Sequence, residues 1–445
     1  MKIAVAFIVV LLVLLPVMGL VTSGDGTPKG RVQTFVSYSM SLTSLLLCLL
    51  TIIVAIYSVT SDIEQCQIYT VVTKPVYRFQ ILVGKFLGVF LLGFVLLVMF
   101  SSMIYFITVY TPKFIDATGE QMNELNNEFY TARASLKPAP VDVSREVTQS
   151  FKELIRKRKI SAEVLEDKLA RQQILEELTK SKELASRSVG PGRQLIWEFN
   201  NVNVKSHDPE GKIFVRYKYE VSVAPPNRRI AGRWTVGDYR QEKYGLPVET
   251  RLWRESRWDV IRTFQELEVP VDVVAEDGYV AVGFVNLPQY NDTTVIFPEK
   301  DGIEVLYKSD SFTANYIRAT ILVLLRLIFL ASLGVFTATF LSFPTAVLFC
   351  LVIFATGTIS GFIFESFSTL GGGTELIYTF TVKPLVRLLP QFDKVNPARF
   401  LVPARLLSWN LLGKVAAVMV SIKAVIVFLL GILIFNRKEI AKIIV

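Results

Sequence analysis

The chain has 445 residues, of which 51% are hydrophobic and 12% aromatic. This composition is too apolar for a disordered chain or an ordinary cytosolic enzyme, and several apolar runs are long enough to cross a bilayer. The single histidine, His207, excludes metal sites and mechanisms that need two histidines. Three cysteines, Cys48, Cys66 and Cys350, exclude a scaffold held together by disulfides.

The net charge of +9 is unevenly distributed along the chain. Residues 111–310 hold 30 basic and 32 acidic side chains, whereas the other 245 residues hold 18 basic and 7 acidic ones. The balanced part is typical of a water-soluble domain, and the basic, apolar part is typical of a membrane protein that faces anionic lipid. No basic face with interleaved aromatic residues is evident, so we expect no nucleic-acid partner.

Six hydrophobic runs reach the roughly 20 residues that a helix needs to cross a ~30 Å hydrocarbon core. The first run is interpreted as a span rather than a cleaved signal peptide, because only Met1-Lys2 precede it and no A-x-A site follows it. Six spans place both termini on one side of the membrane. The predicted spans are Ile3–Val21, Thr34–Val59, Phe86–Tyr110, Tyr316–Leu341, Pro344–Phe364 and Leu412–Phe435.

Charge counting does not decide which side of the membrane is cytoplasmic. Seven Lys and Arg residues flank the spans on the side of the termini, and eight flank them on the other side outside the large insert. The positive-inside rule depends on a bias between short loops, and the two sides of this chain show no such bias.

The insert between the third and fourth spans, residues 111–312, is predicted to fold outside the membrane in two parts. Residues 111–190 are predicted to be helical, because apolar side chains recur with helical spacing in Ser161–Leu184. The fold class is therefore a polytopic α-helical membrane protein with an inserted α+β domain. The flanking membrane parts are residues 1–110 and 313–445.

Residues 195–310 are predicted to form an antiparallel β-sandwich, because apolar and polar residues alternate from Ile213 to Val223. Four of the five tryptophans lie in this part. They are interpreted mainly as core residues, although stacking on sugar rings is the alternative. Further strands are predicted around Trp234 and at Trp253–Val260, Tyr279–Val285, Thr293–Phe297 and Ile303–Tyr307.

Sequence motifs of catalysis are missing. The chain has no G-x-x-x-x-G-K-[ST] phosphate loop, no H-E-x-x-H, no Cys/His metal spacing and no G-x-S-x-G elbow. His207 lies in a polar stretch and is interpreted as a solvated turn residue. We therefore expect no catalysis by this chain alone, and no metal or cofactor.

The connection between the second and third spans, residues 61–85, is predicted to form a short amphipathic helix and a Lys-Pro turn at the membrane surface. It is either an ordinary connector or a contact for a partner. This segment resembles the first cytoplasmic loop of permease subunits of type-2 ATP-binding cassette (ABC-2) transporters, because several of its residues match that loop in the same order. The matching residues are Glu64, Thr70, Lys74-Pro75, Arg78 and Gly84-Lys85.

Two further segments resemble the same family. Phe435-Asn436-Arg437-Lys438-Glu439 is similar to the F-x-R-[RK]-E end of these permeases. The segment Asp301–Ala319, with Phe343-Pro344-Thr345-Ala346, is similar to a subgroup with a large extracytoplasmic insert. The likeness covers the two membrane parts. The chain departs from the family at Cys66-Gln67, where many members carry a small residue, and before the first span, where an amphipathic helix is usual.

The resemblance implies a separate ATPase subunit and a second permease subunit, in a homodimer or heterodimer. It places the protein in a prokaryotic plasma (inner) membrane, with residues 61–85 and both termini in the cytoplasm and residues 111–312 outside the cell. ATP hydrolysis is then expected in the partner chain. The residues implied to couple the two subunits are Asp62, Ile63, Glu64, Gln65, Thr70, Lys74, Pro75 and Arg78.

Two cations fall near the middle of predicted spans, where a charge costs roughly 2.5–3.5 kcal/mol on insertion scales. Arg326 and Lys423 are candidate pathway residues for an anionic or amphiphilic substrate, while pairing with Glu365 or snorkelling explains them equally well. Residues 366–412 mix prolines with basic residues. They are predicted to form short helices in the outer interface, where they bind lipid headgroups or simply snorkel.

Two other functions fit the sequence. In the first, the ATPase moves the insert mechanically against the cell envelope and no cargo crosses the membrane. In the second, the chain is a membrane-anchored binding protein without an ATPase.

Overall fold

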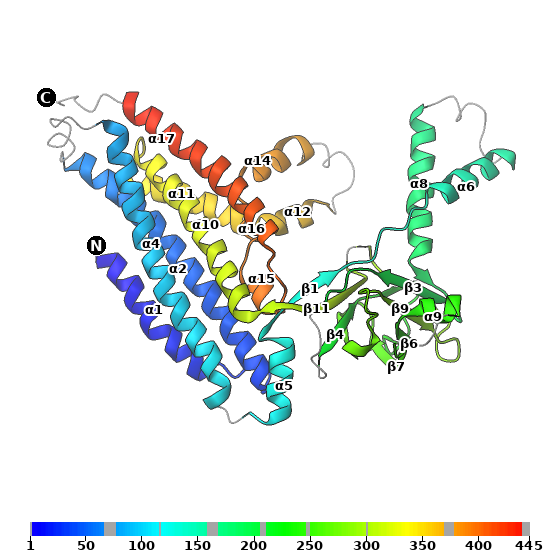
Figure 1. The fold of residues 1–445 in the computed structure, drawn as a ribbon. Helices are drawn as coiled ribbons and strands as arrows, with labels where there is room; N and C mark the ends of the chain where they lie inside the picture. The colour runs from blue at the N-terminus through cyan, green and yellow to red at the C-terminus, as the bar shows by residue number, and fades with distance from the viewer. Residues whose placement is uncertain are drawn as a thin grey trace. The chain divides into compact units, whose positions relative to one another are not determined.

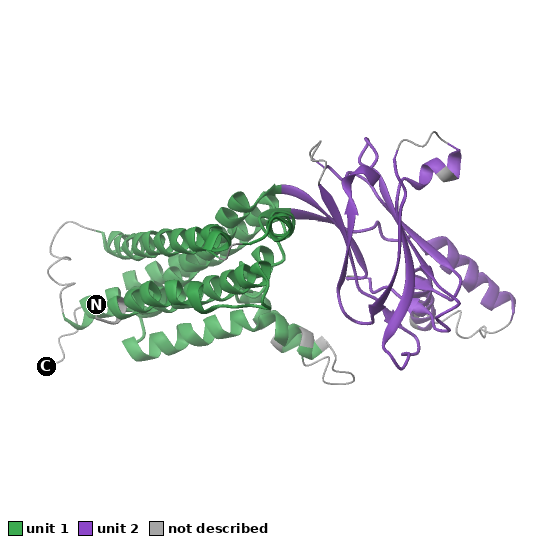
Figure 2. Cartoon of the chain, turned by 90° about the horizontal axis from the view of Figure 1, so that it is seen from below, with its two compact units in different colours: residues 1–132, 310–445 green, residues 133–309 purple. Residues whose placement is uncertain are grey.

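The computed structural model describes residues 2–65, 77–114, 117–157, 168–204, 211–245, 250–299, 301–368 and 378–437. The chain forms two compact units (Figure 2). Unit 1 comprises residues 1–132 and 310–445, and unit 2 comprises residues 133–309.

Unit 1 is a bundle of apolar helices (Figure 1). Within the described ranges, four helices are long and apolar enough to cross a membrane. This agrees with a membrane protein that carries a β domain. The four are α2 (Pro28–Glu64), α4 (Arg78–Phe114), α10 (Phe312–Ala338) and the continuous helix Trp409–Arg437, which consists of α16 (Trp409–Ala416), a π-helical segment (Ala417–Ala424) and α17 (Val425–Arg437).

Two shorter apolar helices complete the bundle, α1 (Lys2–Val21) and α11 (Phe343–Thr358). The predicted span Pro344–Phe364 is interrupted at Ile359, after which α12 (Ser360–Ser368) begins. The 16 residues of α11 extend roughly 24 Å, which is less than a ~30 Å hydrocarbon core. The six predicted spans thus correspond to four long helices and two shorter ones.

The interruption at Ile359 follows from contacts made on either side of it. The carbonyl of Gly357 accepts a hydrogen bond from the backbone N–H of Phe392 at 2.9 Å, and the hydroxyl of Ser360 donates to Asp393 at 2.6 Å. A side chain at Gly361 would overlap that carboxylate. Residues near 392 therefore occupy the space along which a straight helix would continue.

Helix α10 lies at the centre of unit 1 and packs against α2, α4, α11 and α17. It is the most buried of the long helices, whereas α4 and the Trp409–Arg437 helix expose most of their apolar surface. The contact between α10 and α2 is close at Gly334, where an added Cβ would approach the Cβ of Ala55 to 2.7 Å. Small residues allow this approach, as is common between membrane helices.

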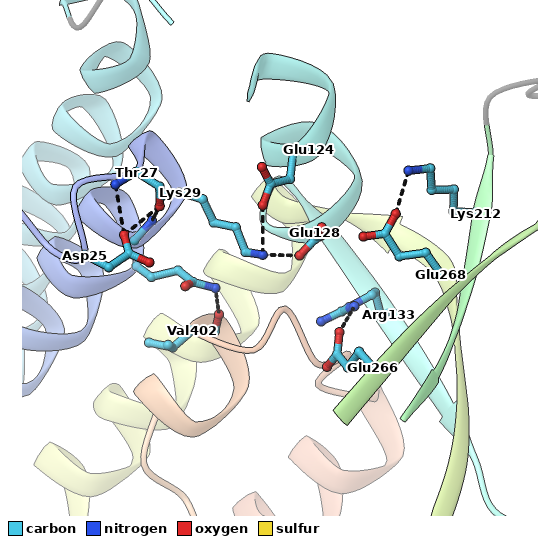
Figure 3. A network of polar contacts seen from close by, with 12 residues as sticks. Asp25, Thr27, Lys29, Glu124, Glu128, Arg133, Lys212, Glu266, Glu268 and Val402 are labelled. Atoms are coloured by element: carbon cyan, nitrogen blue, oxygen red, sulfur yellow. Dashed lines mark hydrogen bonds and ion pairs between the residues drawn. The ribbon is translucent and has the colours of Figure 1, made fainter. Parts of the chain in front are cut away.

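The first part of the predicted insert packs with unit 1. Helix α5 (Gly119–Glu128) is joined to the first turn of α2 because Lys29 binds Glu124 at 3.2 Å and also binds Glu128 (Figure 3). The hydroxyl of Tyr130 then donates to the carbonyl of Thr108 at 2.6 Å. The compact second unit consequently begins at residue 133 rather than at residue 111.

Unit 2 is built on β-strands, and every strand pair for which the register is established is antiparallel. The described strands form three sheets with the orders β1-β11-β4-β8, β2-β10-β5 and β3-β9-β6-β7. They are β1 (Thr131–Leu136), β2 (Ser188–Val189), β3 (Gln194–Phe199), β4 (Lys212–Tyr217), β5 (Glu220–Val221), β6 (Arg229–Gly237), β7 (Trp253–Val260), β8 (Gln265–Pro270), β9 (Val280–Asn286), β10 (Val295–Ile296) and β11 (Ile303–Ser311).

Two details differ from the sequence prediction. The single strand predicted from Ile213 to Val223 is divided into β4 and β5, which belong to different sheets. The part predicted to be helical, residues 111–190, contains the strands β1 and β2 besides α5, α6 (Ser144–Arg156) and α8 (Lys168–Ser186). Helices α6 and α8 pack against each other, as a helical hairpin requires.

The tryptophans of unit 2 divide between core and surface. Trp234 is fully buried and packs against Phe284, with ring centroids 4.8 Å apart, and Trp197 packs against Phe297. Trp258 is 48% exposed and lies edge-on against Tyr290. The assignment to the core is therefore correct for Trp197 and Trp234 and incorrect for Trp258.

Candidate functional site

One end of unit 1 brings together segments that the sequence singled out separately. The end of α2, the start of α4 and the end of α17 lie at this end of the bundle (Figure 1). We call it the coupling end and define it by Asp62, Glu64, Arg78, Lys85 and Asn436.

An ion pair joins α2 to α4 at the coupling end. The carboxylate of Asp62 lies 2.5 Å from the ammonium group of Lys85, and both side chains are partly exposed. Asp62 is in the last turn of α2, while Lys85 is in the second turn of α4. The pair therefore joins the helix that precedes residues 66–76 in the sequence to the helix that follows them.

A hydrogen bond joins α4 to the end of the last helix. The guanidinium of Arg78 donates to the carbonyl oxygen of Asn436 at 3.3 Å, across 358 residues of sequence. The adjacent Phe435 is fully buried in the core of unit 1. Arg78 of the loop motif and Asn436 of the C-terminal motif are thus neighbours in space.

Glu64 is the last residue of α2 and is exposed to solvent. A carboxylate near the C-terminal end of a helix is disfavoured by the helix macrodipole, by about 0.3–1 kcal/mol. The last turn of α2 contains no basic residue that would offset this effect. The stability of α2 therefore does not explain an acidic residue at this position.

The predicted separate surface helix begins differently in the structure. Asp62, Ile63 and Glu64 continue α2 rather than starting a new helix, and Gln65 follows as its C-cap. Ile63 is partly buried and packs against the core of unit 1. Thr70, Lys74 and Pro75 lie outside the described residues.

A second group of side chains binds the backbone of residues 387–407, which we call the return segment. Arg326 of α10 is 7% exposed and donates to the carbonyl of Phe392 at 3.1 Å, to that of Val395 at 3.4 Å and to the hydroxyl of Ser44 at 2.9 Å. Its guanidinium also lies over the ring of Phe392. Arg326 has no carboxylate partner among the described residues.

Lys423 binds the same return segment from the last helix. Its ammonium group donates to the carbonyl of Leu389 at 2.7 Å and to that of Arg387 at 3.2 Å. Arg326 and Lys423 each lie fourteen residues, or roughly 21 Å, from the start of their helices at Phe312 and Trp409. The side chain of Glu365, the predicted partner, lies outside the part of the chain that the structure describes.

Three further polar side chains hold the later part of the return segment. They were not predicted from the sequence, although two of them stand within Ser311–Ala319. Asn315 binds the carbonyl of Arg405 and the N–H of Leu407, both at 2.8 Å. Arg318 binds the carbonyl of Leu407 at 3.4 Å and the carboxylate of Asp310 at 2.5 Å. Gln33 binds the carbonyl of Val402 at 2.9 Å.

These side chains together form what we call the carbonyl clamp. Buried backbone polar groups that have no partner within a helix or sheet need one elsewhere in the protein. Positively charged and amide donors supply the missing hydrogen bonds, and bonds from charged groups are the stronger ones. The clamp consists of Gln33, Asn315, Arg318, Arg326 and Lys423.

The described residues contain no group of three or more His, Cys, Asp and Glu side chains that could hold a metal ion. Cys48 and Cys350 are buried free cysteines. His207 and Cys66 lie outside the described residues.

Comparisons with protein-family models, with curated proteins and with solved structures find no match to this chain.

Proposed function

We propose that this chain is the membrane-spanning permease subunit of an ABC-2 transporter. A separate ATPase subunit hydrolyses ATP, and a second permease subunit completes the membrane unit. The chain itself carries the groups that couple hydrolysis to movement of a substrate across the membrane.

The observation that supports this proposal best is the composition of the coupling end. One sequence segment resembles the family's first cytoplasmic loop and another resembles its C-terminal motif. The bond from Arg78 to Asn436 brings one residue of each segment together. The exposed Glu64 adds an acidic group that the stability of α2 does not require. An ATPase surface with a basic group would give this carboxylate a role.

The proposed topology has six spans, with α1 and α11 counted beside the four long helices. The coupling end then faces the cytoplasm of a prokaryotic cell, and unit 2 lies outside the cell. Lys85 and Arg78 lie at the level of the inner headgroups, where anionic lipid attracts basic side chains.

Force from the ATPase would enter at the last turn of α2. The ion pair between Asp62 and Lys85 carries it to α4, and the close contact at Gly334 carries it to α10. The carbonyl clamp then makes the return segment follow α10, because Arg326 binds it at two carbonyls. Tilting of α2 and α10 thus moves the return segment with them.

The test is purification of the chain from its native membrane in mild detergent, followed by subunit identification and an ATPase assay. We expect a stoichiometric P-loop ATPase subunit and ATP hydrolysis that depends on it, with none from the isolated chain. Turnover by the isolated chain, or a complex that contains no ATPase, would refute the proposal. If substrate-like lipids or peptides stimulate hydrolysis, the complex is a transporter rather than a purely mechanical device.

A further inference from the structure

Two grooves run between neighbouring helices of unit 1, and they differ in chemistry. The first lies between α4 and α10, has a volume of about 380 Å³, and extends from Phe94 to Phe106 on α4. The second has a volume of about 320 Å³ and lies between α4, α10 and the last helix, near Phe86 and Leu429. Both volumes are in the range of ligand pockets.

The surface of the first groove is mostly apolar, but its lining residues carry more hydroxyl groups than those of the second groove. Hydroxyl groups are carried by six of the thirteen lining residues of the first groove, whereas only Ser332 among the ten residues of the second groove has one. The hydroxyl of Ser332 already donates to the carbonyl of Ile328 within its own helix. The six hydroxyl-bearing residues of the first groove are Ser101, Ser102, Tyr105, Thr313, Tyr316 and Thr320.

Some of these hydroxyls retain a hydrogen that a ligand can accept. Tyr105 and Thr313 form a hydrogen bond of 2.8 Å on the exposed side of the groove, and this bond uses one of their two hydrogens. Ser102 is exposed and has no hydrogen-bond partner among the described residues. The deeper part of the groove, around Phe94 and Leu324, is apolar.

A cation lies beyond the polar end of the first groove. Lys113 is exposed in the last turn of α4, seven residues or roughly 10 Å beyond Phe106. At 3.6 residues per turn it projects from α4 within roughly 20° of Phe106 and of Ser102. Its ammonium group lies over the ring of Tyr110, 5.1 Å from the centroid. Lys113 forms no ion pair with any described carboxylate.

From this order of groups we infer that the first groove binds one anionic glycerophospholipid. An acyl chain lies against Phe94 and Leu324, the ester carbonyls accept hydrogen bonds from the free hydroxyls near Tyr105 and Ser102, and the phosphate binds Lys113. The second groove lacks the hydroxyl row and begins at Phe86, next to Lys85, so its lipid preference does not depend on Lys113. The site requires unit 1 to lie in a membrane, but it does not require an ATPase partner.

Photo-crosslinking of the full-length chain tests the site. The chain is reconstituted in nanodiscs that contain equal amounts of phosphatidylglycerol and phosphatidylcholine, with a diazirine on the acyl chain of one lipid or the other. Peptides that contain residues 94–106 and 313–324 should be labelled about fivefold more by phosphatidylglycerol, since one lysine near anionic lipid contributes about that factor. Labelling of the second-groove peptides should be the same in the wild type and in Lys113→Gln.

Three variants sharpen the test. Lys113→Gln should abolish the preference for phosphatidylglycerol, and Ser102→Trp should remove labelling of the first groove by filling it. Leu87→Trp, at an equally exposed apolar position of the second groove, should leave labelling of the first groove unchanged. Equal labelling by both lipids in the wild type, or an undiminished preference in Lys113→Gln, would overturn the inference. Lys113 is exposed, so its replacement keeps the fold even if Ser102→Trp does not.

Discussion

Arg326 binds Phe392 twice, because its guanidinium donates to the backbone carbonyl at 3.1 Å and lies 5.1 Å from the centroid of the ring. One buried cation of α10 thus fixes both the backbone and the side chain of a residue in the return segment. The sequence alone left Arg326 open between a substrate pathway and pairing with Glu365. In the structure Arg326 binds carbonyl groups of its own chain.

Replacing Arg326 with Gln should destabilise unit 1. The carbonyls of Phe392 and Val395 would lose their donor, and an unsatisfied buried polar group costs about 1–3 kcal/mol. We expect a lower thermal unfolding midpoint in detergent. Arg387→Gln is the control, because this exposed side chain lies in the return segment and only its backbone carbonyl is bound. Equal midpoints for the two variants would contradict the role of Arg326 in the clamp.

Adding a methyl group at two glycines should have opposite effects. Gly334→Ala brings a Cβ to 2.7 Å from that of Ala55, so we expect a loss of roughly 1–3 kcal/mol from overpacking between α10 and α2. Gly88→Ala has no atom near its new Cβ and should stabilise α4 by about 0.5–1 kcal/mol. Thermal unfolding of both variants checks this, and a stabilised Gly334→Ala protein would show that α10 and α2 are not closely packed.

The stability of unit 2 should depend on pH through Arg240. Hydrogen bonds from Arg240 hold the pKa of Asp238 and the pKa of Asp277 below their ordinary values. A carboxyl group whose pKa is lower in the folded state adds stability above its unfolded pKa of ~3.9 and loses this contribution as the pH falls through the folded pKa. The contribution is therefore present at pH 7 and disappears in strong acid.

Arg240→Gln should accordingly lower the free energy of unfolding at pH 7 by about 0.2–1 kcal/mol, since these groups are partly exposed. Near pH 2 the difference should shrink to the contribution of the contact between the Arg240 guanidinium and the Tyr279 ring, which does not depend on the carboxylates. Unfolding followed by tryptophan fluorescence measures this, with the exposed Arg251→Gln as control. A difference between wild type and Arg240→Gln that is the same at both pH values would exclude the electrostatic explanation.

Cysteine labelling should establish the proposed orientation. The natural Cys48 and Cys350 are buried, so a Cys66→Ser background gives little labelling of its own. In that background, cysteines at the exposed Glu120 and Asp292 should react with an impermeant maleimide on intact cells. A cysteine at Glu64 should react only after the cells are permeabilised, and the reverse pattern would invert the topology.

Local patterns explain which elements the sequence predicts well. The strand predicted at Trp253–Val260 has the same bounds in the structure, and the span predicted at Tyr316–Leu341 corresponds to Phe312–Ala338. Alternation and hydropathy depend on neighbouring residues alone, so they can be read without a fold. The proposed role of the coupling end comes from the family resemblance and from neither of these patterns.

Elements decided by distant contacts were not predicted. The break at Ile359 depends on Asp393, which binds Ser360 from 33 residues away. Two of the three partners of Arg326 lie 66 and 69 residues further along the chain, and they are backbone carbonyls, which every residue has. Hydropathy predicts that this cation is energetically unfavourable near the middle of a span, but no local pattern identifies which carbonyls bind it.

The exposed carboxylate of Glu64 allows the coupling role to be separated from helix stability. Removing a negative charge from the C-terminal turn should slightly stabilise α2, by about 0.3–1 kcal/mol, while a partner contact would be lost. Glu64→Ala should therefore lower ATPase coupling without lowering the unfolding midpoint. Glu64→Arg adds repulsion against a basic partner group and should have the larger effect on coupling.

The most direct measurement is ATP hydrolysis and subunit co-purification of the reconstituted complex carrying Glu64→Arg, compared with Glu120→Arg. Both glutamates are exposed, but Glu120 lies in the first turn of α5, far in sequence from the coupling end. We expect Glu64→Arg to reduce hydrolysis or retention of the ATPase several-fold and Glu120→Arg to match the wild type. If Glu64→Arg leaves both at the wild-type level, the end of α2 is not the ATPase contact and the proposed function loses its main support.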